Sequence, residues 1–147
     1  LSDGRTMELT AVSMGNPHAV CFVDDFAALP DELFCDPAAK SLRTFDVDRV
    51  GAFFESHPAF PEKANIEFAE VRDGGISMRV FERGCGETLA CGTGTCATQV
   101  AAALTGRAPR RGTVSLLGGD LRIDWDEGGT VLMTGPAAES FRGTVEL

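Results

Sequence analysis

Alternating apolar and polar residues dominate the second half of the chain and predict β-strands. The segments with this period are residues 76–81, 113–117, 121–125 and 131–134. Glycine pairs at 74–75, 118–119 and 128–129 separate such segments and supply the positive φ angles that tight hairpins need. Residues 9–13 and 19–23 are also typical of strands, so the simplest prediction is an antiparallel sheet.

Two segments carry a helical pattern. Asp46 is expected to cap a helix that runs to about Ser56, with its apolar face formed by Val47, Val50, Phe53 and Phe54. The second helix is predicted over residues 95–104, with Gly106 just beyond its end. Because it is apolar around most of its circumference, we expect strands to wrap around it. Residues 25–44 show no clear pattern.

Composition indicates one domain, residues 1–147, with its own core. Hydrophobic residues make up 44% and charged residues 24%, and no apolar run is long enough for a membrane span. The formal net charge of −9 disfavours a nucleic-acid partner. Five cysteines, an odd number, argue against a disulfide framework and for a reducing compartment, so we expect a cytoplasmic location. A chain that begins at Leu1 rather than Met fits a fragment.

Cys91 lies in a glycine-rich turn that leads into the second predicted helix. A helix N-terminus offers unpaired amides and a partial positive charge, which would lower the pKa of the thiol toward neutrality. Gly92 and Gly94 are a poor start for a helix unless the backbone must approach a ligand closely. Cys91 is therefore a candidate acid or base.

Other residues fit cofactor chemistry poorly. The only lysines, Lys40 and Lys63, lie outside any motif, which disfavours a pyridoxal Schiff base. No C-x-x-C pair is present, and neither histidine has ligand spacing, so no metal is expected. Residues 92–97 match a dinucleotide fingerprint formally, but no apolar strand precedes them. The remaining cysteines are expected to be structural: Cys21, Cys35, Cys85 and Cys96.

Residues 82–94 read E-R-G-C-G-E-T-L-A-C-G-T-G, which resembles the second catalytic-cysteine motif of diaminopimelate epimerases. Residues 14–18 (M-G-N-P-H), Asn65 ahead of a strand, and residues 133–137 (M-T-G-P-A) agree with the same family in the same order. The family's first cysteine lies in a C-G-N-G-x-R pattern that these residues do not contain. The chain thus resembles the C-terminal lobe of a two-lobed enzyme.

This resemblance implies an α+β fold in which an antiparallel, barrel-like sheet is wrapped around a central α-helix. It also implies epimerisation of LL-diaminopimelate to meso-diaminopimelate without a cofactor, in lysine and peptidoglycan precursor synthesis. The partner would be the N-terminal lobe of the same protein, and this chain alone would be inactive. Residues 140–147 would be a strand that returns to that lobe. Without it, the strand would fray, pair locally or join another chain, and the bare interface would favour self-association.

The resemblance also assigns roles to individual residues. Cys91 would be one catalytic thiol, with Glu82 helping its protonation, while His18 would assist the thiol of the other lobe. The backbone amides of Gly92 and Thr93 would bind the α-carboxylate of the substrate, in agreement with the helix-terminus argument. The distal end of the substrate would be held by Asn16, Asn65 and Arg83 at its carboxylate and by Glu82 at its ammonium group.

Two alternatives remain. The first is a related racemase or epimerase of another amino acid, of the proline or hydroxyproline type; the charged set around Glu82 and Arg83 favours a substrate with a second charged end. Phenazine-biosynthesis isomerases share the fold but lack the cysteines. The second alternative is a non-catalytic binding module that retains half of an active site.

Overall fold

The computed structural model describes residues 6–73 and 75–146. Residues 1–4, on which the fragment prediction rests, and Gly74 of the first glycine pair lie outside this range. The regular elements, in chain order, are β1 (Thr10–Ser13), β2 (Pro17–Phe22), α1 (Val47–Glu55), β3 (Asn65–Arg72), β4 (Gly75–Glu82), β5 (Gly86–Thr88), α2 (Gly92–Leu104), β6 (Arg111–Leu116), β7 (Gly119–Trp125) and β8 (Val131–Thr134).

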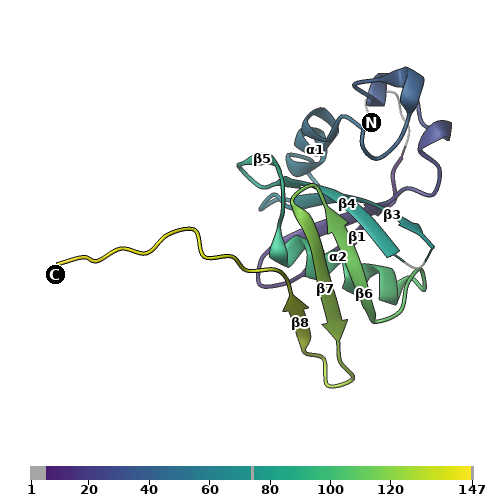
Figure 1. The fold of residues 1–147 in the computed structure, drawn as a ribbon. Helices are drawn as coiled ribbons and strands as arrows, with labels where there is room; N and C mark the ends of the chain where they lie inside the picture. Colours follow the sequence, from purple (N-terminus) through teal and green to yellow (C-terminus); the bar gives the residue numbers. More distant parts are fainter. Residues whose placement is uncertain (1–5, 74, 147) are drawn as a thin grey trace.

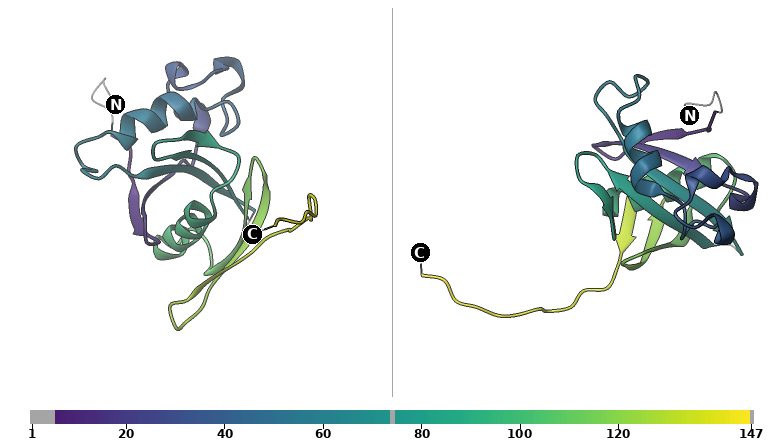
Figure 2. Two further views of the ribbon diagram at one scale, coloured as in Figure 1. Left: turned by 90° about the vertical axis from the view of Figure 1, so that its left-hand side faces the viewer. Right: turned by 90° about the horizontal axis from the view of Figure 1, so that it is seen from above.

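One curled sheet contains all the strands, in the order β1-β2-β3-β4-β6-β7-β8, with β5 paired to β4 (Figure 1). It forms a half-barrel around α2, which confirms the expected architecture of a sheet wrapped around a helix (Figure 2). The sheet is mixed, however, because β2 pairs with β3, and β4 with β6, in parallel. The expectation of a wholly antiparallel sheet was wrong at these two pairings. Alternation within a strand fixes which face each residue takes but not the direction of the neighbouring strand.

Each parallel pairing requires a crossover, and the two crossovers place their helices on opposite faces of the sheet (Figure 2). Helix α2 lies on the concave face and contacts β1, β2, β3, β4, β6, β7 and β8. Helix α1 packs on the other face against β3, β4 and β5. The central strands are therefore covered on both sides.

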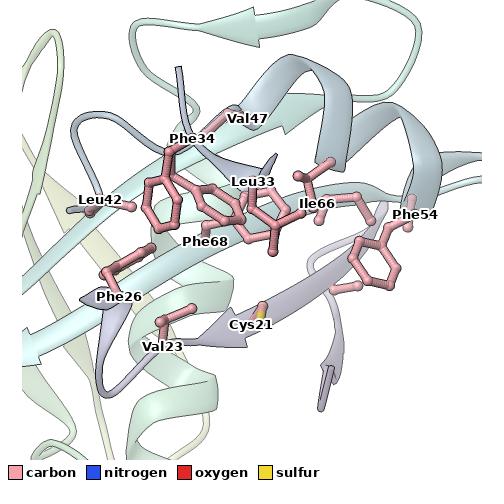
Figure 3. Packing of buried hydrophobic residues seen from close by; sticks show 14 residues of the cluster. Cys21, Val23, Phe26, Leu33, Phe34, Leu42, Val47, Phe54, Ile66 and Phe68 are labelled. Carbon is pink, nitrogen blue, oxygen red and sulfur yellow. The ribbon is translucent and has the colours of Figure 1, made fainter. Parts of the chain in front are cut away.

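Two apolar clusters fill these layers. The outer cluster joins α1 and the segment before it to the sheet, and Phe26, Phe34 and Phe68 lie in it (Figure 3). Phe45 belongs to the same cluster. These rings meet mostly edge to face, with centroids 4.9 to 6.4 Å apart. The inner cluster packs the alanines of α2 against the concave face. Residues 25–44, for which no pattern was clear, form three short 3-10 turns, η1 (Phe26–Ala28), η2 (Asp31–Leu33) and η3 (Pro37–Ala39).

Helix α1 begins as predicted, because the Asp46 side chain accepts a hydrogen bond from the backbone N–H of Arg49. Its buried face differs from the prediction at one position. Phe53 is 40% exposed, whereas Gly51 is buried against the ring of Phe81 on β4. The absence of a side chain at Gly51 lets the helix approach the sheet closely.

Replacing Gly51 with Ala should destabilise the protein, although Ala is about 1 kcal/mol better than Gly within a helix. A Cβ atom at this position would overlap Cβ and a ring carbon of Phe81. Overpacking of this kind costs about 1 to 3 kcal/mol. Chemical denaturation would measure the loss, with exposed Ala52→Gly as a control that should lose only the propensity difference. An increase in the free energy of unfolding of Gly51→Ala would contradict this packing.

Helix α2 begins at Gly92, three residues before the predicted start, and ends before Gly106, whose φ of +71° fits the predicted position just beyond the helix. Its residues from Gly94 to Ala102 are buried, while Leu104 at its end is 64% exposed. The N-terminus of α2 therefore lies inside the curled sheet.

After β8 the described chain has no regular secondary structure and is exposed through residue 146. This segment runs away from the sheet and does not pair with it (Figures 1 and 2). Within the described residues, it forms no strand with this lobe. No helix in residues 6–73 or 75–146 is both long and apolar enough to cross a membrane.

Candidate active site at the start of helix α2

Cys91 occupies the N-cap position of α2 in an extended backbone conformation, with φ −140° and ψ 108°. Its carbonyl oxygen accepts from the backbone N–H and the hydroxyl of Thr95, at 2.9 and 2.7 Å, so the helix start is held firmly. Unlike an oxygen-bearing N-cap residue, Cys91 makes no side-chain hydrogen bond of ordinary capping geometry, and the Gly94 N–H acts on its sulfur only as a weak nearby donor. The residue is 7% exposed.

The pKa of the Cys91 thiol lies above its ordinary value, because burial disfavours the thiolate. The Gly94 backbone N–H and the Thr93 hydroxyl lower this pKa by hydrogen bonding, and the negative charge of Glu82 raises it. The predicted net lowering toward neutrality is therefore wrong for this chain. The helix-terminus contacts exist, but they offset only part of the desolvation.

Strand register brings several polar residues to the face that carries α2. His18 on β2 pairs with Asn65 on β3, and Glu67 lies two positions further along β3 on the same face. Glu67 pairs with Val20 on one side and Val80 on the other, and both valines belong to the inner cluster. These polar side chains are thus directed toward the helix rather than toward solvent.

A continuous series of polar contacts joins this face to Cys91. Glu67 Oε1 lies 2.6 Å from His18 Nδ1, and His18 Nε2 lies 3.1 Å from Asn16 Oδ1. Asn16 Nδ2 donates to Thr93 Oγ1 at 3.3 Å, and Thr93 Oγ1 lies 3.7 Å from Cys91 Sγ. Four residues predicted from the sequence, Asn16, His18, Thr93 and Cys91, therefore meet in one network.

Asn65 and Arg83 form the neighbouring part of the site. The Asn65 side chain donates to the Pro17 carbonyl at 3.1 Å and accepts from the Arg83 backbone N–H at 2.9 Å. Both of its polar atoms are thus used to hold β2, β3 and the turn after β4 together. The Arg83 side chain is exposed and donates to the carbonyl oxygen of Glu62 at 2.9 Å.

Glu82 ends β4 close enough to Cys91 to affect the thiol by charge and by hydrogen bonding. Its Oε1 accepts a 2.6 Å hydrogen bond from the Thr88 hydroxyl of the adjacent strand β5. One carboxylate oxygen is therefore fixed by β5, next to the start of α2.

Both glycines that follow Cys91 lie where side chains would collide with neighbours. A Cβ atom on Gly94 would lie 2.7 Å from Glu67 Oε1 and 3.2 Å from Cys91 Sγ. A Cβ atom on Gly92 would lie 3.1 Å from Cε of Met133 on β8. From the sequence, we expect these glycines to allow close approach of the backbone to a ligand. In the structure, the groups that approach the backbone closely belong to the protein itself.

Glu67 is the site residue that sequence reasoning missed. Its side chain is fully buried, and burial raises the pKa of its carboxyl group. In the sequence it sits between Ile66 and Phe68, where alternation suggests a solvent-facing position. A signal was available in principle, because a strand covered by helices on both faces buries both sets of residues.

The other cysteines are arranged differently. Cys21 is buried in the outer cluster, and burial raises its pKa to about 12. Cys96 is buried within α2, while Cys35 and Cys85 are exposed. Within residues 6–73 and 75–146, no three His, Cys, Asp or Glu side chains converge as metal ligands would.

Comparison with known proteins connects the chain to a family. A sequence model described as diaminopimelate epimerase matches residues 10–139. Among curated proteins, the chain is similar to the diaminopimelate epimerase of Synechococcus elongatus, with 50% identity over 97% of this chain and 46% of that protein. It is also similar to those of Desulfitobacterium hafniense (49% identity, 97% and 45%) and Acetivibrio thermocellus (48% identity, 99% and 47%).

Solved structures with a similar fold include a phenazine biosynthesis PhzC/PhzF protein from Clostridium difficile, with a TM-score of 0.54 and 16% identity over 82% of this chain and 40% of that one. A PhzF-family protein from Enterococcus faecalis matches with a TM-score of 0.53, the same identity and the same coverage. These two likenesses concern the fold alone. The chain spans about half the length of the curated relatives. From the sequence match over residues 10–139 and the identity to these relatives, the chain belongs to the diaminopimelate epimerase family, whose members are isomerases.

Proposed function

We propose that this chain is the lobe of a diaminopimelate epimerase that supplies Cys91 as one of two catalytic thiols. The observation that carries the proposal is the placement of Cys91 Sγ at the N-terminus of α2, in contact with Thr93 and the Gly94 amide. One thiolate removes the α-proton and becomes a thiol, while a second thiol protonates the opposite face of the carbanion and becomes a thiolate. Protons and charge balance without a cofactor.

The start of α2 suits the α-carboxylate of the substrate. The backbone amides of Gly92 and Thr93 belong to the first turn, where helix N–H groups have no intrahelical acceptor. A carboxylate there would sit beside the sulfur and would place the α-carbon within its reach. We assign binding of the α-carboxylate to these two amides.

The remaining site residues suit the distal end of a diamino diacid. We assign the distal carboxylate to the exposed guanidinium of Arg83, to Asn65, which contacts the Arg83 backbone N–H, and to Asn16. Glu82 offers a carboxylate to an ammonium group. His18 lies on the same network and is assigned to assist the second thiol. A substrate without a charged distal end, such as proline, would offer no group for Arg83 and Glu82 to bind.

The second thiol has to come from another lobe, because the site described here contains only one candidate. Exposed apolar side chains near the start of α2 offer a surface for that lobe: Leu89, two residues before Cys91, is 67% exposed, and Met133, next to Gly92, is 50% exposed. We propose that the N-terminal lobe covers this surface and that the last residues of the chain pair with it. A cytoplasmic location would fit free thiols at Cys91 and elsewhere.

Adding a separately expressed N-terminal lobe to this chain should produce exchange of the substrate α-proton with solvent deuterium, whereas the chain alone should give none. Proton NMR of diaminopimelate in D2O measures this exchange, and each lobe alone is the control. Absence of exchange by the intact two-lobed protein at every pH would contradict the assignment as an epimerase and favour a binding module.

A further inference from the structure

Glu67 is a carboxyl group enclosed in the concave face of the sheet, and the family assignment gives it no role. Its side chain and that of His18 are both fully buried. Glu67 Oε1 contacts His18 Nδ1 at 2.6 Å, while Oε2 has no hydrogen-bond partner among the described residues. A buried carboxyl group with one bare oxygen is costly, particularly when ionised.

The hydrogen bonds at Asn16 determine which nitrogen of His18 carries hydrogen. The Asn16 amide nitrogen donates to Thr93 Oγ1, which leaves Asn16 Oδ1 as an acceptor 3.1 Å from His18 Nε2. Nε2 must then be the N–H donor. In a neutral imidazole, which has only one N–H, this makes Nδ1 an acceptor and gives the hydrogen in the 2.6 Å contact to Glu67.

The same reasoning continues to the sulfur. Thr93 Oγ1 accepts from Asn16, so its own hydrogen is left to donate toward Cys91 Sγ at 3.7 Å. We propose that Glu67 is a positioning residue that sets the direction of this hydrogen-bond chain, so that each donor points toward the sulfur of Cys91. The chain runs Glu67, His18, Asn16, Thr93, Cys91.

Direction matters because a donor on sulfur stabilises the thiolate, whereas a reversed chain would make the thiol donate to Thr93 and would stabilise the neutral form. Burial raises the pKa of the Glu67 carboxyl group, which is the direction that favours a protonated carboxyl group as the initial donor. Among the described residues, the charged group that acts on the sulfur is Glu82 on β4, which disfavours the thiolate. The inference deepens the proposed function, because it concerns the same thiol.

The test compares two substitutions in the 147-residue chain by following the 13Cβ shift of Cys91, which reports ionisation without requiring solvent access. Glu67→Gln keeps a donor, because its amide can donate to His18 Nδ1, whereas Glu67→Met has similar length and no donor. Glu67→Met should raise the titration midpoint of Cys91 by about half to one pH unit, the size expected for one lost hydrogen bond. Glu67→Gln should leave it nearly unchanged, and exposed Cys35 and Cys85 serve as internal references.

Equal shifts in both variants, or no shift in Glu67→Met, would overturn the proposal. A second measurement uses the unaltered chain and holds even if Glu67→Met fails to fold. The 15N shifts of its two histidines should show hydrogen on Nε2 alone for His18, with exposed His57 as reference. Hydrogen on Nδ1 of His18 near neutral pH would overturn it. Neither readout needs epimerisation, so a failure of the proposed function would be recognised separately.

Discussion

Replacing Cys91 with Ala should abolish epimerisation by the two-lobed protein, with a fall of about 10²- to 10⁴-fold, the usual range for loss of a general acid or base. Ala removes the sulfur but leaves the backbone of the N-cap position, so substrate binding at the α2 amides should survive. Exchange of the substrate α-proton and the ratio of epimers would be measured together. Both should fall, because each direction of the reaction needs two thiols.

Two matched substitutions test whether the loss of activity is specific to Cys91 or follows the removal of any cysteine. Cys85 is exposed in the turn before β5, and Cys96 is buried within α2. Cys85→Ala and Cys96→Ala should largely retain activity, although the latter loses some packing inside the sheet. Equal losses in all three variants would contradict a specific role for Cys91.

Replacing Gly94 with Ala should reduce epimerisation nearly as much as replacing Cys91 with Ala, although the added methyl group is not reactive. The new Cβ would lie 2.7 Å from Glu67 Oε1 and 3.2 Å from Cys91 Sγ, so the carboxyl group, the sulfur or the helix start must move. Displacements of about 1 Å in a catalytic site commonly cost about 100-fold in rate. Steady-state kinetics of the two-lobed protein would measure the loss.

Gly75→Ala is the matched control for this substitution. A Cβ on Gly75 would meet nothing closer than a carbonyl oxygen at 3.7 Å, which is ordinary contact. Its activity should be close to that of the unaltered protein. If Gly94→Ala were as active as Gly75→Ala, the close packing of Cys91, Gly94 and Glu67 would be of no functional importance.

Much of the fold was predictable because local patterns carry it. The strands over 76–81 and 121–125, and the cap at Asp46, were confirmed within one or two residues. The start of α2 was placed three residues late because Gly92 and Gly94 are poor helix formers, and burial overrides that weak preference. The short strand β5 was missed, since three partly polar residues give no periodic signal.

The residues of the candidate site could be named from the sequence, but the contacts between them could not. Motif resemblance named Asn16, His18, Thr93 and Cys91, yet their contact depends on the register of β2 against β3 and on where α2 starts. Glu67 gave no signal because its place between Ile66 and Phe68 is equally typical of a residue that meets water. Its burial follows from helices on both faces of the sheet, which a local pattern does not specify.

The two crossovers on opposite faces also bear on how the chain reaches its native state. The β6–β7 hairpin closes over adjacent residues and can form early, as can the β3–β4 pair. Pairing β2 with β3 instead requires closure of the whole intervening segment, residues 23–64, at an entropic cost that only later packing of α1 offsets. Folding of this lobe should therefore be limited by that long-range closure rather than by formation of its helices.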